Sequence, residues 1–372
     1  MAATYRVILT PEERRRLDSL AKSSRTGLRT AMLARALLLC DESPEGPGWA
    51  SRDVGRVLGI PVRTADGLKR RLVEDGMDRA LGRAVPPDFG PRPPRPGGPS
   101  EALPLASSGP TQARARWTAS LLGSNAVELS FADPCPPSPG PGVPASPGSG
   151  PPRRRYFRIP AQSDAAFVAH MEDLLGVYLL PRDPLFPVLC LDWSEKRLVA
   201  GAPGPGGGPI TPGVEFSANG LGGILMAVEP LAGRRLASVS GGVTHADLAV
   251  FLRKILDEQY PEARKVALIL DYRNTHALAA LHETLPRPEA SRLCGLLEIH
   301  RAPRLGSWLN MARIELGVLN GQRLEGRIGD LDELRHEVGA WQDDNPMAPI
   351  AWRLSFEDAR KRLRHLYPIP SL

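Results

Sequence analysis

Short apolar runs rich in Val, Ile and Leu predict β-strands in the second half of the chain. They cover residues 187–192, 266–270 and 297–300, and two further runs, 223–229 and 235–240, flank a turn and so predict a β-hairpin. Apolar positions at helical spacing predict the helices between and after these strands. These helices are expected at 164–178, 244–260, from 275, from about 308, at 330–341 and at 356–366.

The order of these elements indicates the fold class. A strand with a hairpin, followed by helix, strand and helix, is the order of an RNase H-like sheet. We therefore expect residues 155–372 to form an α/β domain of RNase H-like fold that ends in C-terminal helices.

The helix signals in residues 1–84 predict an all-α domain that precedes the α/β domain. Residues 10–13 place a hydroxyl cap, a proline and two acids at the start of a helix from Pro11. An apolar stripe predicts a second helix over 28–40.

The next helical segment resembles a helix-turn-helix, with Ser51 capping the first helix, Gly59 at the turn and Thr64 near the start of a basic second helix. If that helix enters the major groove of DNA, its polar side chains can contact phosphates or base edges. Gly67, which weakens a helix by roughly 1 kcal/mol, and Asp66, whose charge repels phosphate, count against this interpretation. The alternative is a helical bundle with a solvated basic face. The DNA-binding candidates are Arg52, Arg63, Thr64, Lys69, Arg70 and Arg71.

Residues 85–154 have the composition of a linker. Runs of Pro and Gly at both ends of this segment exclude a packed core there. A short helical island is expected at about 112–129, either as part of a second DNA-contacting unit or as residual helix in a disordered linker.

Composition and charge narrow the class of partner. The chain has 372 residues, of which 42% are hydrophobic and 24% charged, and a net charge of +6. An excess of arginine favours a polyanionic partner, because the guanidinium matches phosphate oxygens in pairs. No apolar run approaches the roughly 20 residues of a membrane span, and no signal-peptide core begins the chain, so we expect a cytoplasmic protein that binds no membrane. The four cysteines lack the spacing of a zinc site or a disulfide framework.

Several segments carry a family resemblance that covers almost the whole chain. The segments are Arg-Ala-Arg-Trp-Thr, Phe-Val-Ala-His-Met-Glu-Asp-Leu-Leu, Cys-Leu-Asp-Trp-Ser-Glu-Lys, Val-Glu-Pro-Leu-Ala-Gly, Leu-Asp-Tyr-Arg-Asn-Thr-His, Gly-Ser-Trp-Leu-Asn-Met-Ala and Asp-Ala-Arg-Lys-Arg-Leu. With these segments the chain resembles bacterial insertion-sequence transposases of the mariner superfamily, the insertion-sequence-630 group. The resemblance fails mainly at 131–152, where the family continues with a second helical DNA-binding segment and this chain has a Pro/Gly/Ser run. Our hypothesis is that this run is an out-of-frame stretch, and translation of the neighbouring reading frames tests it.

This resemblance implies cut-and-paste DNA transposition by three acids that hold two Mg²⁺ or Mn²⁺ ions. It implies double-stranded DNA as partner, through terminal inverted repeats and a TA target, and a homodimer when active, associated with the bacterial nucleoid. Asp192 and Asp271 match the first two acids and are the expected catalytic residues and metal ligands. Asn274, His276 and Asn310 are expected to order the surrounding loops.

The third acid of the family pattern is replaced by Arg313. A guanidinium has no lone pair for a metal and stays protonated, so it cannot serve as a ligand. Glu315 is the nearest substitute, but two residues along a helix rotate it by about 200°, away from the site. We therefore expect a transposase whose strand cleavage is impaired; the alternative is an inactive DNA-binding relic or competitor at element ends. A third reading, a nuclease related to RNase H, gives no reason for the helix-turn-helix.

Overall fold

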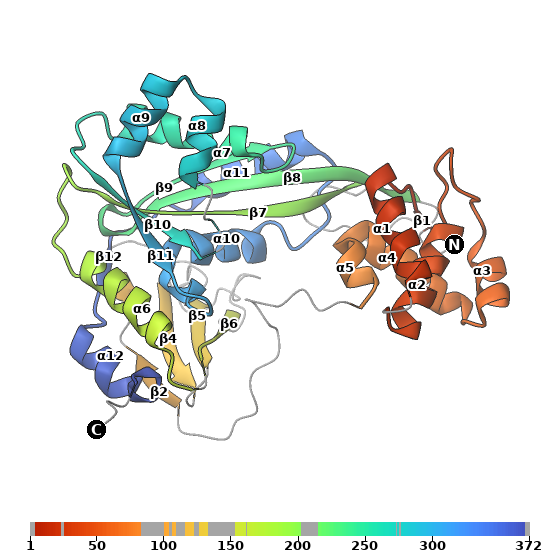
Figure 1. Cartoon of the computed structure of the whole chain (residues 1–372), viewed down its shortest axis with the longest axis horizontal. Helices are drawn as coiled ribbons and strands as arrows, with labels where there is room; N and C mark the ends of the chain where they lie inside the picture. Colours follow the sequence, from red (N-terminus) through yellow and green to blue (C-terminus); the bar gives the residue numbers. More distant parts are fainter. Residues whose placement is uncertain are drawn as a thin grey trace, which may run out of the picture.

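The computed structural model shows two regions, a group of helices near the N-terminus and a larger α/β region (Figure 1). The residues that the structure describes are 4–23, 26–82, 100–103, 106–108, 116–122, 126–132, 153–160, 162–201, 215–272, 274 and 277–368. Within these residues, no helix has the length and apolar character that a membrane crossing requires.

A mixed six-stranded sheet forms the centre of the α/β region, and all its strands except β1 lie where apolar runs predicted strands. Its strands are β1 (Thr4–Arg6), β7 (Val188–Ala200), β8 (Glu215–Glu229), β9 (Arg234–Ser240), β10 (Val266–Asp271) and β11 (Leu297–Ala302). The order is β1-β8-β7-β10-β11, and β9 pairs with β8. The strands β7, β8 and β9 are antiparallel, whereas β10 lies parallel to both β7 and β11.

Helices cover both faces of this sheet because successive strand residues point to opposite sides. On β7, Leu189 and Leu191 pack into one apolar cluster with α7, α8 and α9, while Val188 and Cys190 pack into the other with α6, α10, α11 and α12. The helices are α6 (Ala165–Tyr178), α7 (His245–Lys254, continued as a π-helix over Ile255–Gln259), α8 (Ala277–Thr284), α9 (Arg287–Leu296), α10 (Met311–Gln322), α11 (Leu331–Asp344) and α12 (Phe356–Arg362).

The N-terminal helices surround an apolar core of their own. They are α1 (Pro11–Lys22), α2 (Leu28–Leu39), α3 (Ser51–Leu58), α4 (Val62–Asp75) and α5 (Met77–Ala80). Thr10 caps α1 as expected and forms a capping box with Glu13, and Gly59 ends α3 in the left-handed conformation with φ 66°. The predicted cap Ser51 is wrong by one residue: Ala50 occupies the N-cap without a side-chain hydrogen bond, and Ser51 begins the helix.

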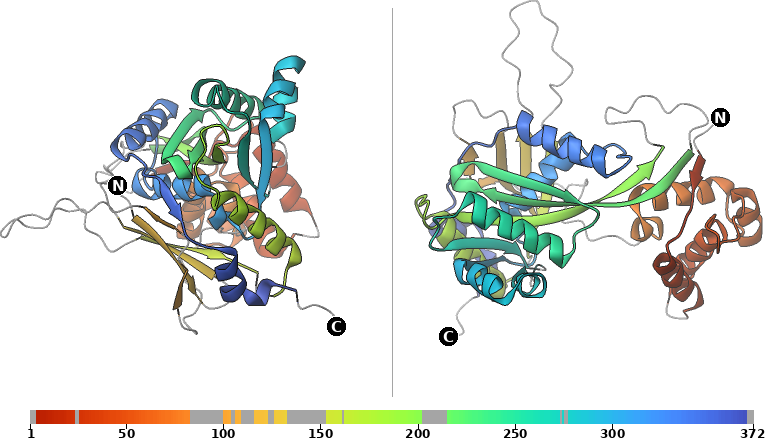
Figure 2. Two further views of the ribbon diagram at one scale, coloured as in Figure 1. Left: turned by 90° about the vertical axis from the view of Figure 1, so that its left-hand side faces the viewer. Right: turned by 90° about the horizontal axis from the view of Figure 1, so that it is seen from above.

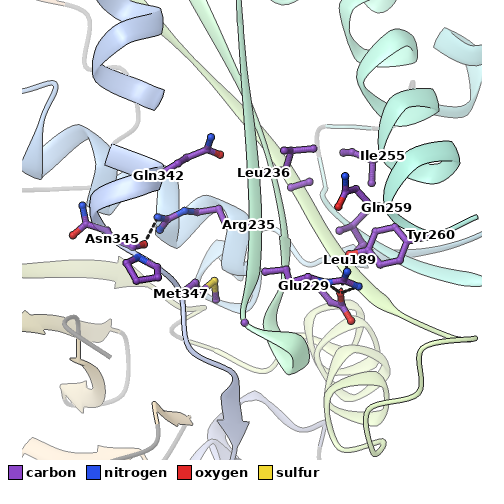
Figure 3. A pocket seen from close by; sticks show the side chains of 14 residues that line it. Leu189, Glu229, Arg235, Leu236, Ile255, Gln259, Tyr260, Gln342, Asn345 and Met347 are labelled. Carbon is purple, nitrogen blue, oxygen red and sulfur yellow. Dashed lines mark hydrogen bonds and ion pairs between the residues drawn. The ribbon is translucent and has the colours of Figure 1, made fainter. Parts of the chain in front are cut away.

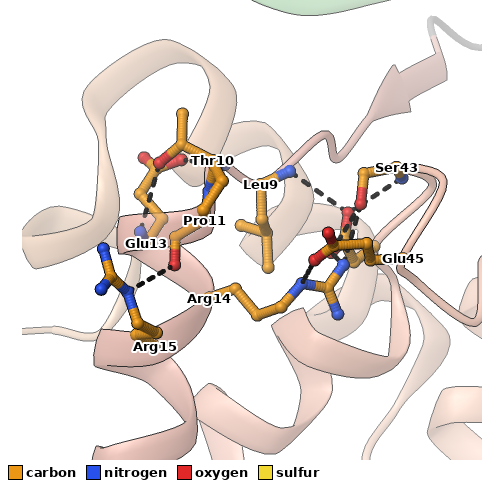
Figure 4. A network of polar contacts seen from close by, with 9 residues as sticks. Leu9, Thr10, Pro11, Glu13, Arg14, Arg15, Ser43 and Glu45 are labelled. Atoms are coloured by element: carbon orange, nitrogen blue, oxygen red, sulfur yellow. Dashed lines mark hydrogen bonds and ion pairs between the residues drawn. The ribbon is translucent and has the colours of Figure 1, made fainter.

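A buried carboxylate, that of Asp41, joins the start of α1 to the end of α2. Figure 4 shows Leu9, Arg14 and Ser43, which contact it. Asp41 is fully buried, and its Oδ1 accepts hydrogen bonds from the backbone N of Leu9 at 3.2 Å and of Ser43 at 3.0 Å. The guanidinium of Arg14 pairs with its other oxygen and donates to Ser43 Oγ at 2.8 Å. Both oxygens of the Asp41 carboxylate have partners within the chain. The carboxylate therefore stabilises the chain reversal after α2 and does not form a ligand-binding site.

The expectation of a helical island at about 112–129 is wrong, because the described residues there form strands. β4 (Arg116–Leu122) and β5 (Ala126–Ala132) lie in an antiparallel sheet of order β2-β4-β5-β6, with β2 (Ser100–Leu103) and β6 (Arg153–Arg158), and β3 (Ala106–Ser108) pairs with β12 (Ile350–Trp352). Val127, Leu129 and Phe131 alternate with polar or small residues, which is the period of a strand. The sequence expectation followed the short apolar pair in β4 and missed this alternation.

The N-terminal helices are attached to the main sheet by contacts that the sequence did not predict. Beyond the main sheet, β7 and β8 continue as a two-stranded extension that reaches these helices (Figure 2). There β1 pairs with β8 in parallel, and Arg327 Nε donates to Glu74 Oε1 of α4 at 2.9 Å. Arg327 Nη2 also donates to Tyr5 Oη at 2.9 Å, and its guanidinium lies 4.6 Å from the centre of the Phe216 ring.

Replacing Arg327 by alanine is expected to loosen this junction. The substitution removes a partly buried ion pair and the hydrogen bond to Tyr5, so the free energy of unfolding should fall by about 1–2 kcal/mol. Hydrogen exchange of α4 should accelerate, as measured by mass spectrometry. Arg335→Ala is the matched control, because that arginine pairs with Asp332 on the exposed surface and should contribute about 0.5 kcal/mol or less. Equal effects of the two substitutions would contradict a special role for Arg327.

Candidate active site

Two aspartates lie side by side on neighbouring interior strands of the main sheet. Asp192 belongs to β7 and Asp271 ends β10, and these strands are parallel neighbours in which Leu191 is registered with Leu270. Asp192 is 3% exposed and Asp271 is 1% exposed. The structure thus brings together the two acids that the sequence singled out.

Asp192 is held by two donors and faces a cation. Its Oδ1 accepts hydrogen bonds from the backbone N of Trp193 at 2.8 Å and from Asn274 Nδ2 at 3.4 Å. Its Oδ2 accepts no hydrogen bond from the described residues and lies 3.7 Å from Arg313 Nη1. The cation nearest to this oxygen is therefore the side chain that replaces the expected third acid.

Asp271 is oriented by a serine that sequence reasoning did not select. Ser307 Oγ donates to Asp271 Oδ2 at 3.1 Å, and Ser307 is itself buried. The backbone N of Asn274 donates to the carbonyl oxygen of Asp271 at 2.9 Å, which closes the turn after β10. Ser307 opens the segment that carries Asn310 and Arg313, so its position in that motif was the available signal.

Asn310 fixes the start of α10 against β7. Its Oδ1 accepts from the backbone N of Ala312 at 3.1 Å, which caps the helix, and its Nδ2 donates to the carbonyl oxygen of Leu191 at 3.2 Å. Tyr178 Oη adds a 2.6 Å hydrogen bond to the carbonyl oxygen of Leu309. These contacts hold the first turn of α10, and with it Arg313, beside Asp192. His276, which was expected near this site, lies outside the described residues.

The buried position of Asp192 changes its protonation. Burial raises the pKa of this carboxyl to about 6, the Arg313 guanidinium opposes the rise, and the charge of Asp271 adds to it. Hydrogen bonds from Trp193 and Asn274 also lower the pKa, but they do not offset burial. Asp192 is therefore mostly ionised at neutral pH, where it pairs with Arg313.

Glu315 points to the other side of α10, as its helical position predicted. Its carboxylate pairs with Arg235 Nη1 at 2.5 Å, and both side chains are buried. The Arg235 guanidinium lies 3.5 Å from the centre of the Trp341 ring, so the pair joins α10, β9 and α11. Glu315 is thus committed to a structural ion pair.

A cavity of about 300 Å³ lies elsewhere on the sheet (Figure 3). Its lining includes Glu229, Arg235 and Tyr260 but neither Asp192 nor Asp271. The buried Glu229 carboxylate is satisfied within the chain, by Tyr260 Oη at 2.9 Å and by Arg234 Nη2 at 2.7 Å. This cavity is therefore separate from the two aspartates.

Comparison with known families agrees with this geometry. Residues 222–335 match the family model described as DDE superfamily endonuclease. The C-terminal half contains a DDE superfamily endonuclease domain. The matched span contains Asp271 and Arg313, whereas Asp192 precedes it. The mixed α/β sheet agrees with a DDE or RNase H-like domain, preceded by a helical N-terminal region. No curated protein sequence matches the chain.

The endonuclease family implies divalent metal ions, and the residues of this site do not fit them. Among the residues that the structure describes, no group of three or more His, Cys, Asp or Glu side chains could hold a metal. The two aspartates provide carboxylate ligands, but the next group around Asp192 is a guanidinium, which repels a cation and has no lone pair to donate. The positive charge that metal ions would supply is partly supplied here by Arg313.

The predicted DNA-binding residues divide into two sets. Arg52 on α3 and Arg63 and Arg70 on α4 are exposed, and Thr64 and Arg71 are partly buried. Lys69 points inward instead: it is 8% exposed, and its Nζ lies 3.3 Å from Glu42 Oε1. The expectation that Lys69 is available to DNA is therefore wrong. Lys69 lies four residues after Ala65 and three before Leu72, so it shares the buried face of the helix with them.

Proposed function

We propose that this protein is an insertion-sequence transposase by family, and that Arg313 impairs its own strand cleavage. Two findings support the family: the endonuclease match over residues 222–335, and the sequence motifs that surround both aspartates. The observation that supports impaired strand cleavage is the distance of 3.7 Å between Arg313 Nη1 and Asp192 Oδ2. In family members the corresponding position is an acid.

The proposed substrate is double-stranded DNA that carries the terminal inverted repeats of the element, with a TA dinucleotide as target. Residues 1–84 would bind the repeats through a helix-turn-helix formed by α3 and α4, and residues 155–372 would hold the disabled cleavage site. The exposed side chains of Arg52, Arg63 and Arg70 support this assignment, since they present positive charge to solvent on α3 and α4. By family, the active assembly would be a homodimer.

Arg313 gives this site different chemistry from that of a nuclease. Metal-dependent cleavage needs cations to activate the attacking oxygen and to stabilise the leaving oxygen. Here the Asp192 carboxylate is paired with a guanidinium, and the Asp271 carboxylate accepts a hydrogen bond from Ser307. Neither arrangement activates water, so strand cleavage should be weak or absent while DNA binding by the N-terminal helices persists.

The second candidate function is a DNA-binding protein that occupies element ends without cutting them. The same Arg313–Asp192 pair favours this alternative, because it removes cleavage without affecting α3 and α4. The two functions predict the same binding and differ only in residual cleavage.

The test combines binding and cleavage on duplexes that carry the terminal repeats of the element. We expect gel retardation in EDTA, weakened by Arg63→Ala, and no metal-dependent nick when Mg²⁺ or Mn²⁺ is added. Cleavage by the natural chain that is lost in Asp192→Ala would overturn the impairment. Failure to retard any duplex, with the chain shown by circular dichroism to be folded, would overturn both candidate functions.

A further inference from the structure

One face of α4 carries an acid among arginines. Arg63, Asp66 and Arg70 are all exposed, and their spacings of three and four residues place them on the same side of the helix. The opposite side, with Ala65, Leu68, Leu72 and Val73, is buried in apolar clusters. The face formed by the exposed Arg63, Asp66 and Arg70 and the half-buried Gly67 is called here the α4 face.

The second half of α4 is occupied by contacts with the rest of the chain. Glu74 accepts hydrogen bonds from Arg327 and Tyr5, and Val73 packs against Val199 and Phe216 of the two-stranded extension. These contacts fix the direction of α4 and leave the Arg63 end of the α4 face accessible. In a helix that enters the major groove, the N-terminal residues are the ones that reach base edges.

In addition to burial, the charge of Asp66 raises the pKa of the Cys40 thiol, but Asp66 gains no opposite charge there. It forms no hydrogen bond or ion pair with the residues that the structure describes, although arginines stand three residues before it and four residues after it. A face that bound only phosphates would be weakened by this acid, because like charges repel. A carboxylate has a defined use in the major groove, where it accepts a hydrogen bond from the N4 amino group of cytosine.

Gly67 provides an independent observation in the same place. A Cβ at this position would meet only Arg71 Nη1, at 3.6 Å, so no packing inside the protein requires glycine. Glycine in a helix costs about 1 kcal/mol relative to alanine, and a common compensation is close approach of the backbone to a ligand. On the α4 face, a backbone position without a side chain thus lies next to the only acid of that face.

We propose that Asp66 is a specificity-determining residue that reads a cytosine in the major groove, with Arg63 and Arg70 contacting the neighbouring guanines or phosphates. The inference rests on the proposed DNA-binding function and adds to it a residue and a base. The occupant of the α4 face is duplex DNA, because arginines flank the acid and Arg52 is exposed on the preceding helix α3.

The experiment selects binding sites from a randomised duplex library with the full chain. We expect one position at which the natural chain prefers cytosine by roughly tenfold, which is the scale of one specific base contact. Asp66→Ala should lose that preference. Asp66→Asn should shift it toward adenine, since an amide donates and accepts hydrogen bonds as adenine requires. The control Asp75→Asn removes the same charge from an exposed position outside the α4 face and should leave the preference unchanged.

Two results would overturn the inference. If Asp66→Ala selects the same sites as the natural chain and binds all of them more tightly, Asp66 acts only by repulsion of phosphates. If Asp75→Asn changes the preferred base as Asp66→Asn does, the effect belongs to net charge. Enrichment of no duplex by the natural chain would instead overturn the proposed DNA-binding function itself, so the two failures are distinct.

Discussion

Arg313→Glu is expected to give the protein a divalent-metal site that the natural chain lacks. Arg313 lies in the first turn of α10, which Asn310 and Tyr178 hold against β7, and its guanidinium already reaches within 3.7 Å of Asp192. A glutamate from the same backbone position would add a third carboxylate to Asp192 and Asp271. Three carboxylates without a cation repel one another, so the folded variant should gain stability when metal binds.

The measurement is thermal unfolding of the natural chain and the variant in EDTA and in increasing Mg²⁺ or Mn²⁺. Loss of a residue that only orients a metal ligand costs about 10–100-fold in affinity or activity, so gain of a ligand should raise metal affinity at least about tenfold. The midpoint for Arg313→Glu should rise with metal concentration, whereas that of the natural chain should change little. Metal-dependent cleavage of terminal-repeat DNA should appear in the same variant.

Arg313→Gln is the control, because it removes the positive charge without adding a carboxylate. If Arg313→Gln responds to metal as strongly as Arg313→Glu, the missing ligand is not the defect, and the guanidinium alone blocks the site. A second control, Arg313→Glu combined with Asp192→Ala, should lose the metal response. If Arg313→Glu unfolds like the natural chain at every metal concentration, the proposed position of the third acid is wrong.

The parts of the fold that the sequence predicted are those set by local patterns. The hydroxyl cap of Thr10, the turn at Gly59 and the strand that ends at Asp271 all depend on residues close in the chain. The prediction that the other strand ends at Asp192 was wrong, because β7 continues to Ala200. The pairing of the two aspartates was expected from the family resemblance, and in the structure it follows from the parallel register of β7 with β10.

The parts that the sequence did not predict depend on contacts between distant segments. β1 can pair with β8 because the β7–β8 extension is long enough to reach it, and no local sequence pattern predicts that length. Burial of Lys69 follows from the position of Glu42 after α2, and selection of Ser307 needed the distance to Asp271. From the sequence alone, a lysine on a basic helix is predicted to be exposed, and only the position of its partner shows that it is buried.

Asp192→Asn is expected to stabilise the protein at neutral pH. The folded carboxyl has a pKa of about 6, against an ordinary value of 3.8. Between these two pH values the folded state keeps a proton that the unfolded chain has lost. The stability that this proton contributes is therefore present below about pH 4 and is lost as the pH rises to about 6. A difference of about two pKa units corresponds to about 3 kcal/mol.

Asparagine cannot ionise, so the variant avoids this loss while its side-chain oxygen can still accept from Trp193 N and Asn274 Nδ2. Urea unfolding in EDTA over a series of pH values should show similar stability near pH 4 and an advantage of about 2–3 kcal/mol for the variant above pH 6. Asp332→Asn, at an exposed position, is the control and should leave the pH profile unchanged. Parallel profiles for the natural chain and Asp192→Asn would mean that Arg313 neutralises the buried carboxylate completely, and the proposed cost of its burial would be wrong.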